Sequence, residues 1–200
     1  MSIQHNFEKK KSQSIIAFSR LKLTVDRIGL TPKELLRYDF WDIQNTSNVA
    51  LEDFYWRDFL PTDAVRLETI YTGTWNEELT YSVTYKTNLK DRRYTVLADN
   101  LSTKVVNRLV CTPQALGLAA NEYVTEFRFE FGTVQPGFKE VEAPYIFVHV
   151  LEDLPNEYQF VNRTDVGGRY GEKWTYDKDS WVTVLYNTPK GKLPKTGVWL

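Results

Sequence analysis

The chain has 200 residues, with 25 basic and 26 acidic side chains and a formal net charge of −1. This balance excludes the extended basic surface with which proteins bind nucleic acid or an anionic membrane. Hydrophobic residues make up 42% of the chain and aromatic residues 14%, which indicates a folded domain rich in strands. No apolar run approaches the roughly 18–20 residues of a membrane-spanning helix, so we expect no membrane span.

The chain is poor in the residues that usually carry catalysis. Cys111 is the single cysteine, so we expect neither an intrachain disulfide nor a cysteine-based metal site. The two histidines are His5, in the polar start of the chain, and His149, in an apolar run. A Ser-His-Asp or Cys-His mechanism would depend on His149, whose surroundings predict a structural position on a strand. We therefore expect no catalytic residues, no cofactor, no metal and no enzyme.

The chain begins with a polar leader and then changes to a strand-like pattern. Residues 1–14 are polar and charged and predict a flexible leader. Residues 19–25 alternate, so that Leu21, Leu23 and Val25 share one face of an expected strand.

The next segments predict one helical turn and two strands. Residues 31–36 carry the signals of a helix start, with a threonine cap followed by proline. Strands are expected at 38–43 and 49–58. The second strand ends at 60–61, because Pro61 cannot donate to a β-ladder.

The remainder of the chain continues as short strands separated by turns. Residues 124–131 alternate strictly, with Phe127, Phe129 and Phe131 on one face. Only 113–117 suggests another helical turn. Parallel sheets would need helical stretches between strands, and these are absent from the pattern. Further strands are expected at 79–85, 93–97, 104–111, 145–151, 159–162, 168–174 and 181–186.

The sequence thus predicts an all-β fold: an antiparallel Ig-like or jelly-roll β-sandwich, as one large sandwich or two closely packed ones. We expect the sandwich region to span 15–187. Within it, 15–71 and 152–187 are expected to be Ig-like and 72–151 to be a jelly-roll-like insertion, as implied by resemblances of these segments to Ig-like modules and to jelly-roll carbohydrate-binding modules. Residues 188–200 are expected to form an extended tail.

Residues 45–61 carry a recognisable pattern: an Asn/Thr turn, an alternating strand and a closing Asp-x-Leu-Pro. A parity shift at Glu52 and Asp53 predicts a β-bulge in this strand. The segment resembles the conserved-repeat Ig-like modules of Gram-positive surface proteins, the "domain of unknown function 11" family. The resemblance implies an Ig-like fold and a surface location. The matching residues are Asn45, Thr46, Asn48, Val49, Leu51, Phe54, Trp56, Asp58, Leu60 and Pro61.

A second motif lies near the end of the chain and is similar to the LPxTG signal of sortase substrates. In such proteins the Thr–Gly bond is cleaved and the threonine is joined to the cell wall. An apolar segment of about 20 residues normally follows, whereas here residues 198–200 follow. The resemblance implies an extracellular, wall-anchored parent protein with sortase as a partner. The motif consists of Leu193, Pro194, Lys195, Thr196 and Gly197.

The surface-protein resemblance raises one covalent possibility. Some Gram-positive surface domains carry a spontaneous Lys–Asn isopeptide bond, assisted by a buried Asp or Glu, with Lys on the first strand and Asn on the last. By position, the candidates are Lys22 and Asn187. Lys22 lies on the opposite face from Leu21 and Leu23, which favours a solvated side chain.

Aromatic residues beside polar turns suggest a possible ligand. Trp75, Trp174 and Tyr176 are candidates for contact with a glycan, although such residues also fill the cores of large sandwiches. We therefore expect a non-enzymatic cell-surface module with a structural or adhesive role, binding a host or cell-wall polymer. The alternative is a carbohydrate-binding module that uses 72–151.

Overall fold

The computed structural model describes residues 35–185, and almost all of its regular structure consists of strands. One short helix, α2 (Pro113–Leu116), is present in this part of the chain. The strands are β1 (Leu35–Asp39), β2 (Leu51–Phe59), β3 (Val65–Tyr71), β4 (Thr74–Trp75), β5 (Thr80–Thr87), β6 (Thr95–Ser102), β7 (Arg108–Val110), β8 (Val124–Val134), β9 (Glu140–Glu142), β10 (Tyr145–Val150), β11 (Gln159–Tyr170) and β12 (Lys173–Val184).

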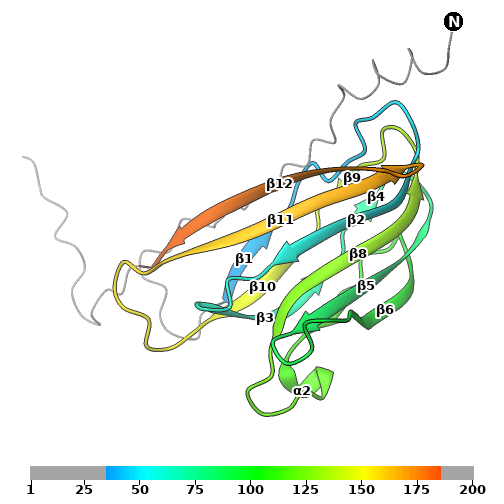
Figure 1. Ribbon diagram of the computed structural model, residues 1–200. Coiled ribbons are helices and arrows are strands. Elements are labelled where there is room, and N and C mark those ends of the chain that lie inside the picture. The colour runs from blue at the N-terminus through cyan, green and yellow to red at the C-terminus, as the bar shows by residue number, and fades with distance from the viewer. Residues whose placement is uncertain (1–34, 186–200) are drawn as a thin grey trace, which may run out of the picture.

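Two antiparallel sheets form the layers of a sandwich, which confirms the predicted all-β class (Figure 1). The larger sheet has the order β12-β11-β2-β8-β5-β6, and the smaller has the order β1-β10-β3-β7. Strands β4 and β9 form a separate two-stranded pair. Strand β2 pairs with both β11 and β8, so the sheets do not divide at the boundaries expected for an insertion at 72–151.

Aromatic side chains from both sheets fill the core. Phe127 and Phe129 of β8 point inward, as their alternation predicts, and their ring centroids lie 5.4 and 4.7 Å from that of Trp56. From the smaller sheet, Phe40 follows β1 and reaches the same indole, 4.7 Å away. Tilted and edge-on contacts of this kind add to the stabilisation that burial of the rings supplies.

The predicted bulge in β2 is confirmed and has a consequence for the interior. The register with β8 shifts between Leu51 and Phe54, and Asp53 has a positive φ of 48°. The extra residue lets Leu51 and Phe54 both face the core, although they are three positions apart. From Phe54 the strand alternates normally, which brings Trp56 and Asp58 to the inner face.

The structure differs from the predicted elements near its start. Leu35 and Leu36, expected in a helical turn, belong to β1, and 31–34 lie outside the described residues. Strand β1 pairs with β10, so that Leu36 lies opposite Val148. Burial in the sandwich therefore overrides the local helix signal. The turn expected at 113–117 does form, as α2, capped by the Thr112 side chain.

The last hairpin is longer than its sequence pattern suggests. Strands β11 and β12 are paired and have 12 residues each. The expected segment 159–162 lies at the start of β11, 168–174 spans the turn between the two strands, and 181–186 overlaps the end of β12. Strand β12 is the last strand of the larger sheet within 35–185, and most of its side chains are exposed there, so polar residues such as Lys178 are tolerated. These polar residues interrupt the apolar pattern without interrupting the strand.

Candidate functional site: a buried carboxyl–amide pair

A carboxyl and an amide meet in the interior of the sandwich. Asp58 of β2 is fully buried and Asn162 of β11 is 1% exposed. Asn162 Nδ2 donates a hydrogen bond of 2.7 Å to Asp58 Oδ1. Both residues occupy inward positions, since Asp58 follows Trp56 by two residues and Asn162 follows the buried Phe160 by two. Strand alternation therefore forces two polar side chains into an apolar layer.

Each member of this pair retains an oxygen without a hydrogen-bond partner. Asp58 Oδ2 and Asn162 Oδ1 are both buried and unpartnered within 35–185. No basic side chain of the described region forms an ion pair with Asp58. A buried, unpaired carboxylate is very costly, so the group takes up a proton instead.

The electrostatic surroundings favour the neutral form of the carboxyl. Burial is the main cause and raises the pKa of Asp58 well above its ordinary value. The Asn162 hydrogen bond opposes this shift, and the negative charge of Asp165 on the outer face of β11 adds to it. The surroundings of Asp58 therefore favour its protonated, uncharged form.

Neighbouring polar groups are satisfied, which sets the pair apart. Trp56 Nε1 donates to Thr164 Oγ1 at 2.8 Å, and the same hydroxyl donates to the Arg57 carbonyl. Across the sandwich, the hydroxyl of Tyr38 lies 3.3 Å from Thr183 Oγ1. Burial raises the pKa of Tyr38, which therefore remains a neutral phenol.

A second buried carboxyl offers a comparison. Glu140 of β9 accepts a hydrogen bond from the Asp42 backbone through Oε1, while its Oε2 is buried without a partner among the described residues. Burial raises the pKa of this group also. No side-chain amide in 35–185 hydrogen-bonds to Glu140, so the combination of acid and amide occurs at Asp58 and not here.

The structure separates Trp75 from the other two predicted glycan-contacting residues. Trp75 is 1% exposed and stacks on Phe138, with ring centroids 5.3 Å apart, so it belongs to the core and cannot contact a glycan at the surface. Trp174 and Tyr176 are 54% and 70% exposed on edge strand β12. The aromatic composition alone does not distinguish these two situations.

Other predicted residues lie outside the described part of the chain or away from the pair. Lys22, Asn187 and the motif at 193–197 lie outside the described residues. His149 is on the outer side of β10, 2.9 Å from Glu68. Within 35–185, no three His, Cys, Asp or Glu side chains are grouped so that they could hold a metal, and no helix there has the length and apolarity to cross a membrane.

Sequence reasoning does not identify the Asp58–Asn162 pair. It places Asp58 in the 45–61 pattern and Asn162 in the strand expected at 159–162, without bringing the two together. A signal is present, since Asp58 follows the inward Trp56 by two residues and Asn162 follows the inward Phe160 by two. The pattern cannot show that the two residues lie side by side in the fold, because they are 104 positions apart in the sequence.

Comparison with known proteins finds little similarity to this chain. No family model matches the chain, and no curated protein matches it. One solved structure that aligns with the chain is that of AvmM, described in the words "AvmM Catalyzes Macrocyclization in Alchivemycin A Biosynthesis". It has a TM-score of 0.33 and 10% sequence identity, covering 88% of this chain and 91% of that one.

This finding corrects the expected function. The sequence predicts a non-enzymatic surface module with a structural or adhesive role, or else a carbohydrate-binding module. AvmM is described as a catalyst, and this finding contradicts the expectation of a non-enzymatic module. At this TM-score and identity, the likeness does not assign an activity to the present chain. The family resemblance and the surface location stay predictions.

Proposed function

We propose that Asp58 and Asn162 form the centre of a single-turnover amide exchange, in which a lysine of this chain becomes covalently joined to Asn162. The observation that carries the proposal is the fully buried Asp58 carboxyl, hydrogen-bonded to the Asn162 amide while each keeps one oxygen unpartnered among the described residues. A satisfied structural pair would not leave both groups incomplete in the core.

The reaction balances without an added reagent. The neutral lysine Nζ attacks Asn162 Cγ, a bond forms between these atoms, and the Cγ–Nδ2 bond breaks. The departing nitrogen takes the proton that the amine loses and leaves as ammonia. No oxidant or reductant is consumed. The product is a secondary amide that joins the lysine side chain to the side chain of Asn162 on β11.

Asp58 supplies the acid–base chemistry in this proposal. A half-turn of the Asn162 amide exchanges its oxygen and nitrogen, so that protonated Asp58 donates to Asn162 Oδ1. This hydrogen bond polarises the carbonyl and stabilises the negative charge that develops on its oxygen during attack. The carboxyl then passes a proton from the attacking amine to the departing nitrogen. Burial raises the pKa of Asp58 and so favours the protonated form that this role requires.

Burial contributes in two further ways. A low-dielectric environment favours the neutral form of a lysine that enters it, and the neutral amine is the nucleophile. The apolar wall around the pair, which includes Trp56, Phe127 and Phe160, also keeps water away from the activated carbonyl. Water at this position would hydrolyse Asn162 instead.

The lysine is assigned to the chain outside the described residues. Lys86, Lys90 and Lys139 are engaged at the surface, with Glu126, Glu122 and Asp42. Lys22, on the first predicted strand, is the proposed nucleophile, and Asn162 replaces Asn187 as the proposed acceptor. The assignment requires Lys22, rather than Leu21 or Leu23, to face Asp58.

Intact-protein mass spectrometry tests the proposal. The wild-type chain is expected to weigh one ammonia less than its sequence requires, and a peptide map should contain Lys22 joined to Asn162. Asp58→Asn and Asn162→Ala should both restore the full mass. Glu130→Gln is the matched control, because this carboxyl is on the outer face of the same sheet and pairs with Arg128.

The outcomes separate the reaction from the choice of lysine. A folded wild-type chain with the full sequence mass would overturn the proposal. A crosslink that persists in Lys22→Arg would leave the reaction in place and reject Lys22 as its nucleophile.

A further inference from the structure

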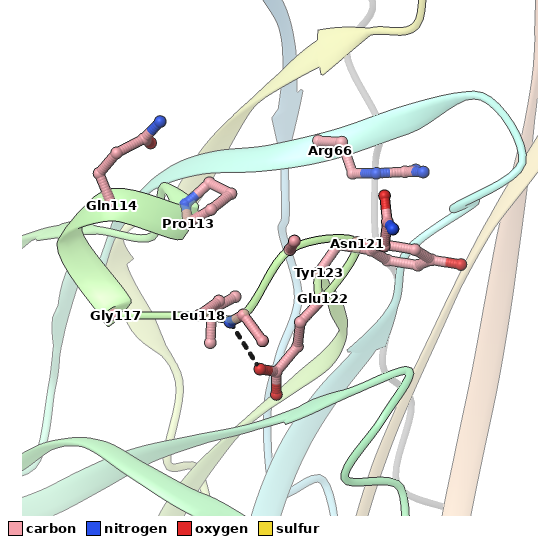
Figure 2. Close-up of a pocket in the computed structure, with 10 residues that line it drawn as sticks. Arg66, Pro113, Gln114, Gly117, Leu118, Asn121, Glu122 and Tyr123 are labelled. Atoms are coloured by element: carbon pink, nitrogen blue, oxygen red, sulfur yellow. Dashed lines mark hydrogen bonds between the residues drawn. The ribbon is translucent and has the colours of Figure 1, made fainter.

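A cleft of about 530 Å³ lies beside α2 and the loop that follows it (Figure 2). One wall comes from α2 and the loop that follows it, and the opposite wall from Arg66 of β3. The loop contributes the small residues Gly117, Ala119 and Ala120, which leave the space open and carry no charge.

Arg66 is held rigidly at the edge of this cleft. Its Nη1 donates to the backbone carbonyls of Thr62 and Val65, and its guanidinium carbon lies 3.9 Å from the centroid of the Tyr123 ring. Two backbone acceptors and one aromatic face fix the plane of the guanidinium. The group is therefore oriented before any ligand arrives.

The same guanidinium has no anionic partner in the described part of the chain. No carboxylate of 35–185 forms an ion pair with Arg66, and its Nε and Nη2 donate no hydrogen bond to the described residues. Partial burial lowers the pKa of Arg66, as expected for a cation that has lost water without gaining a counter-charge. Two fixed donors on one edge of a guanidinium match the two oxygens of a carboxylate.

Glu122, the acidic residue of the loop, is not the anionic partner of Arg66. Glu122 is turned inward, where it accepts hydrogen bonds from the Ala119 backbone at 3.0 Å and Thr87 Oγ1 at 2.7 Å. Lys90 pairs with it from the surface at 3.2 Å. In Figure 2 the dashed bond ties Glu122 to its own loop, whereas the Asn121 side chain points toward Arg66. Asn121 thus offers a second, uncharged donor to a ligand at the guanidinium.

We propose that this cleft binds a monovalent carboxylate carrying a small apolar group, with Arg66 as the anchor and Asn121 as a second hydrogen-bond donor. The apolar group would contact Pro113, Leu118 and the alanines of the loop. A single guanidinium suits one negative charge, and the nearby Glu122 carboxylate disfavours a phosphate dianion. This inference does not depend on the amide exchange proposed above.

An NMR titration of the full chain with two small probes tests the inference. N-acetyl-L-leucine carries the carboxylate and the apolar group, whereas N-acetyl-L-leucine amide differs only in lacking the charge. We expect the acid to cause saturable shifts at Arg66 Nε and at the backbone amides of 119–123, and the amide probe to cause none. Equal shifts with both probes, or no shifts with the acid, would overturn the proposal.

Variants of the anchor sharpen the test. Arg66→Gln should weaken binding of the acid on the order of tenfold or more, because it removes a charge-assisted bidentate contact. Arg66→Lys should bind with intermediate strength, since an ammonium is a point charge. Arg108→Gln is the control, because this exposed arginine lies outside the cleft and contacts Tyr71. Unaltered binding of the acid by a folded Arg66→Gln variant would also reject the site. If this variant does not fold, the comparison of the two probes on the wild-type chain tests the proposal by itself.

Discussion

The ring of Tyr55 lies directly over Gly167 on the outer face of the larger sheet. The two residues are opposite each other in the β2–β11 ladder, and a Cβ at Gly167 would lie 2.7 Å from Tyr55 Cε1. The same ring contacts Arg128, whose guanidinium carbon is 4.3 Å from the ring centroid. Glycine is needed here for space, since the backbone at Gly167 has no positive φ.

Gly167→Ala should therefore destabilise the protein by roughly 1–3 kcal/mol, because the tyrosine ring or a strand must shift. Urea unfolding measures the change. In a Tyr55→Ala background the same substitution should cost much less, because the obstructing ring is gone. An equal cost in both backgrounds would show that the close approach does not determine the requirement for glycine.

Asp58 should make stability decrease as pH rises. Its folded-state pKa is raised, so the carboxyl stays protonated in the folded chain at pH values where the unfolded chain has already ionised. From about pH 4 upward, the folded chain therefore retains a proton on Asp58 that the unfolded chain has released, so folding requires uptake of a proton. The resulting loss of stability is at most about 1.4 kcal/mol per pH unit, and it continues up to the folded-state pKa.

The measurement is best made without the proposed crosslink. We expect Lys22→Arg to lose stability between pH 4 and pH 8 more steeply than Lys22→Arg/Asp58→Asn, in which the titrating group is absent. Chemical denaturation across this range compares the two chains. Parallel pH profiles would show that Asp58 has an ordinary pKa in the folded protein.

The Thr164 hydroxyl should contribute to the stability of the fold, because it accepts the hydrogen bond of the buried Trp56 indole. Thr164→Val keeps the shape of the side chain but leaves Trp56 Nε1 without an acceptor, which should cost about 1–3 kcal/mol. Thr84→Val is the matched control, since the hydroxyl of buried Thr84 makes one weak contact of 3.5 Å to the Arg128 carbonyl. Similar losses in both variants would contradict the assigned role of the Trp56 bond.

Cys111 should be unreactive in the folded protein. The thiol is buried, and burial raises its pKa to about 12, so very little thiolate is present at neutral pH. Since the thiolate is the reactive species, a thiol reagent should modify Cys111 much more slowly in the native chain than after unfolding. Time-resolved mass measurement of the labelled protein checks this. Labelling of the native chain at the rate of a free thiol would contradict the burial.

Much of the local structure follows from the sequence by itself. The alternation at 124–131 predicts which residues of β8 face the core, and the parity shift at Glu52 and Asp53 predicts the bulge in β2. Thr112 and Gly117 mark the ends of α2. These features depend on steric and hydrogen-bonding rules that act within a few residues, so a local pattern is sufficient to determine them.

Tertiary structure decided the rest. It turned Leu35 and Leu36 into part of a strand, placed Trp75 in the core and joined Asp58 to Asn162 across two strands. It also brought Arg66 opposite the loop that follows α2. Strand periodicity determines which face a side chain occupies but not which strand lies beside it. That choice depends on the burial of the whole apolar surface, to which residues far apart in the chain contribute together.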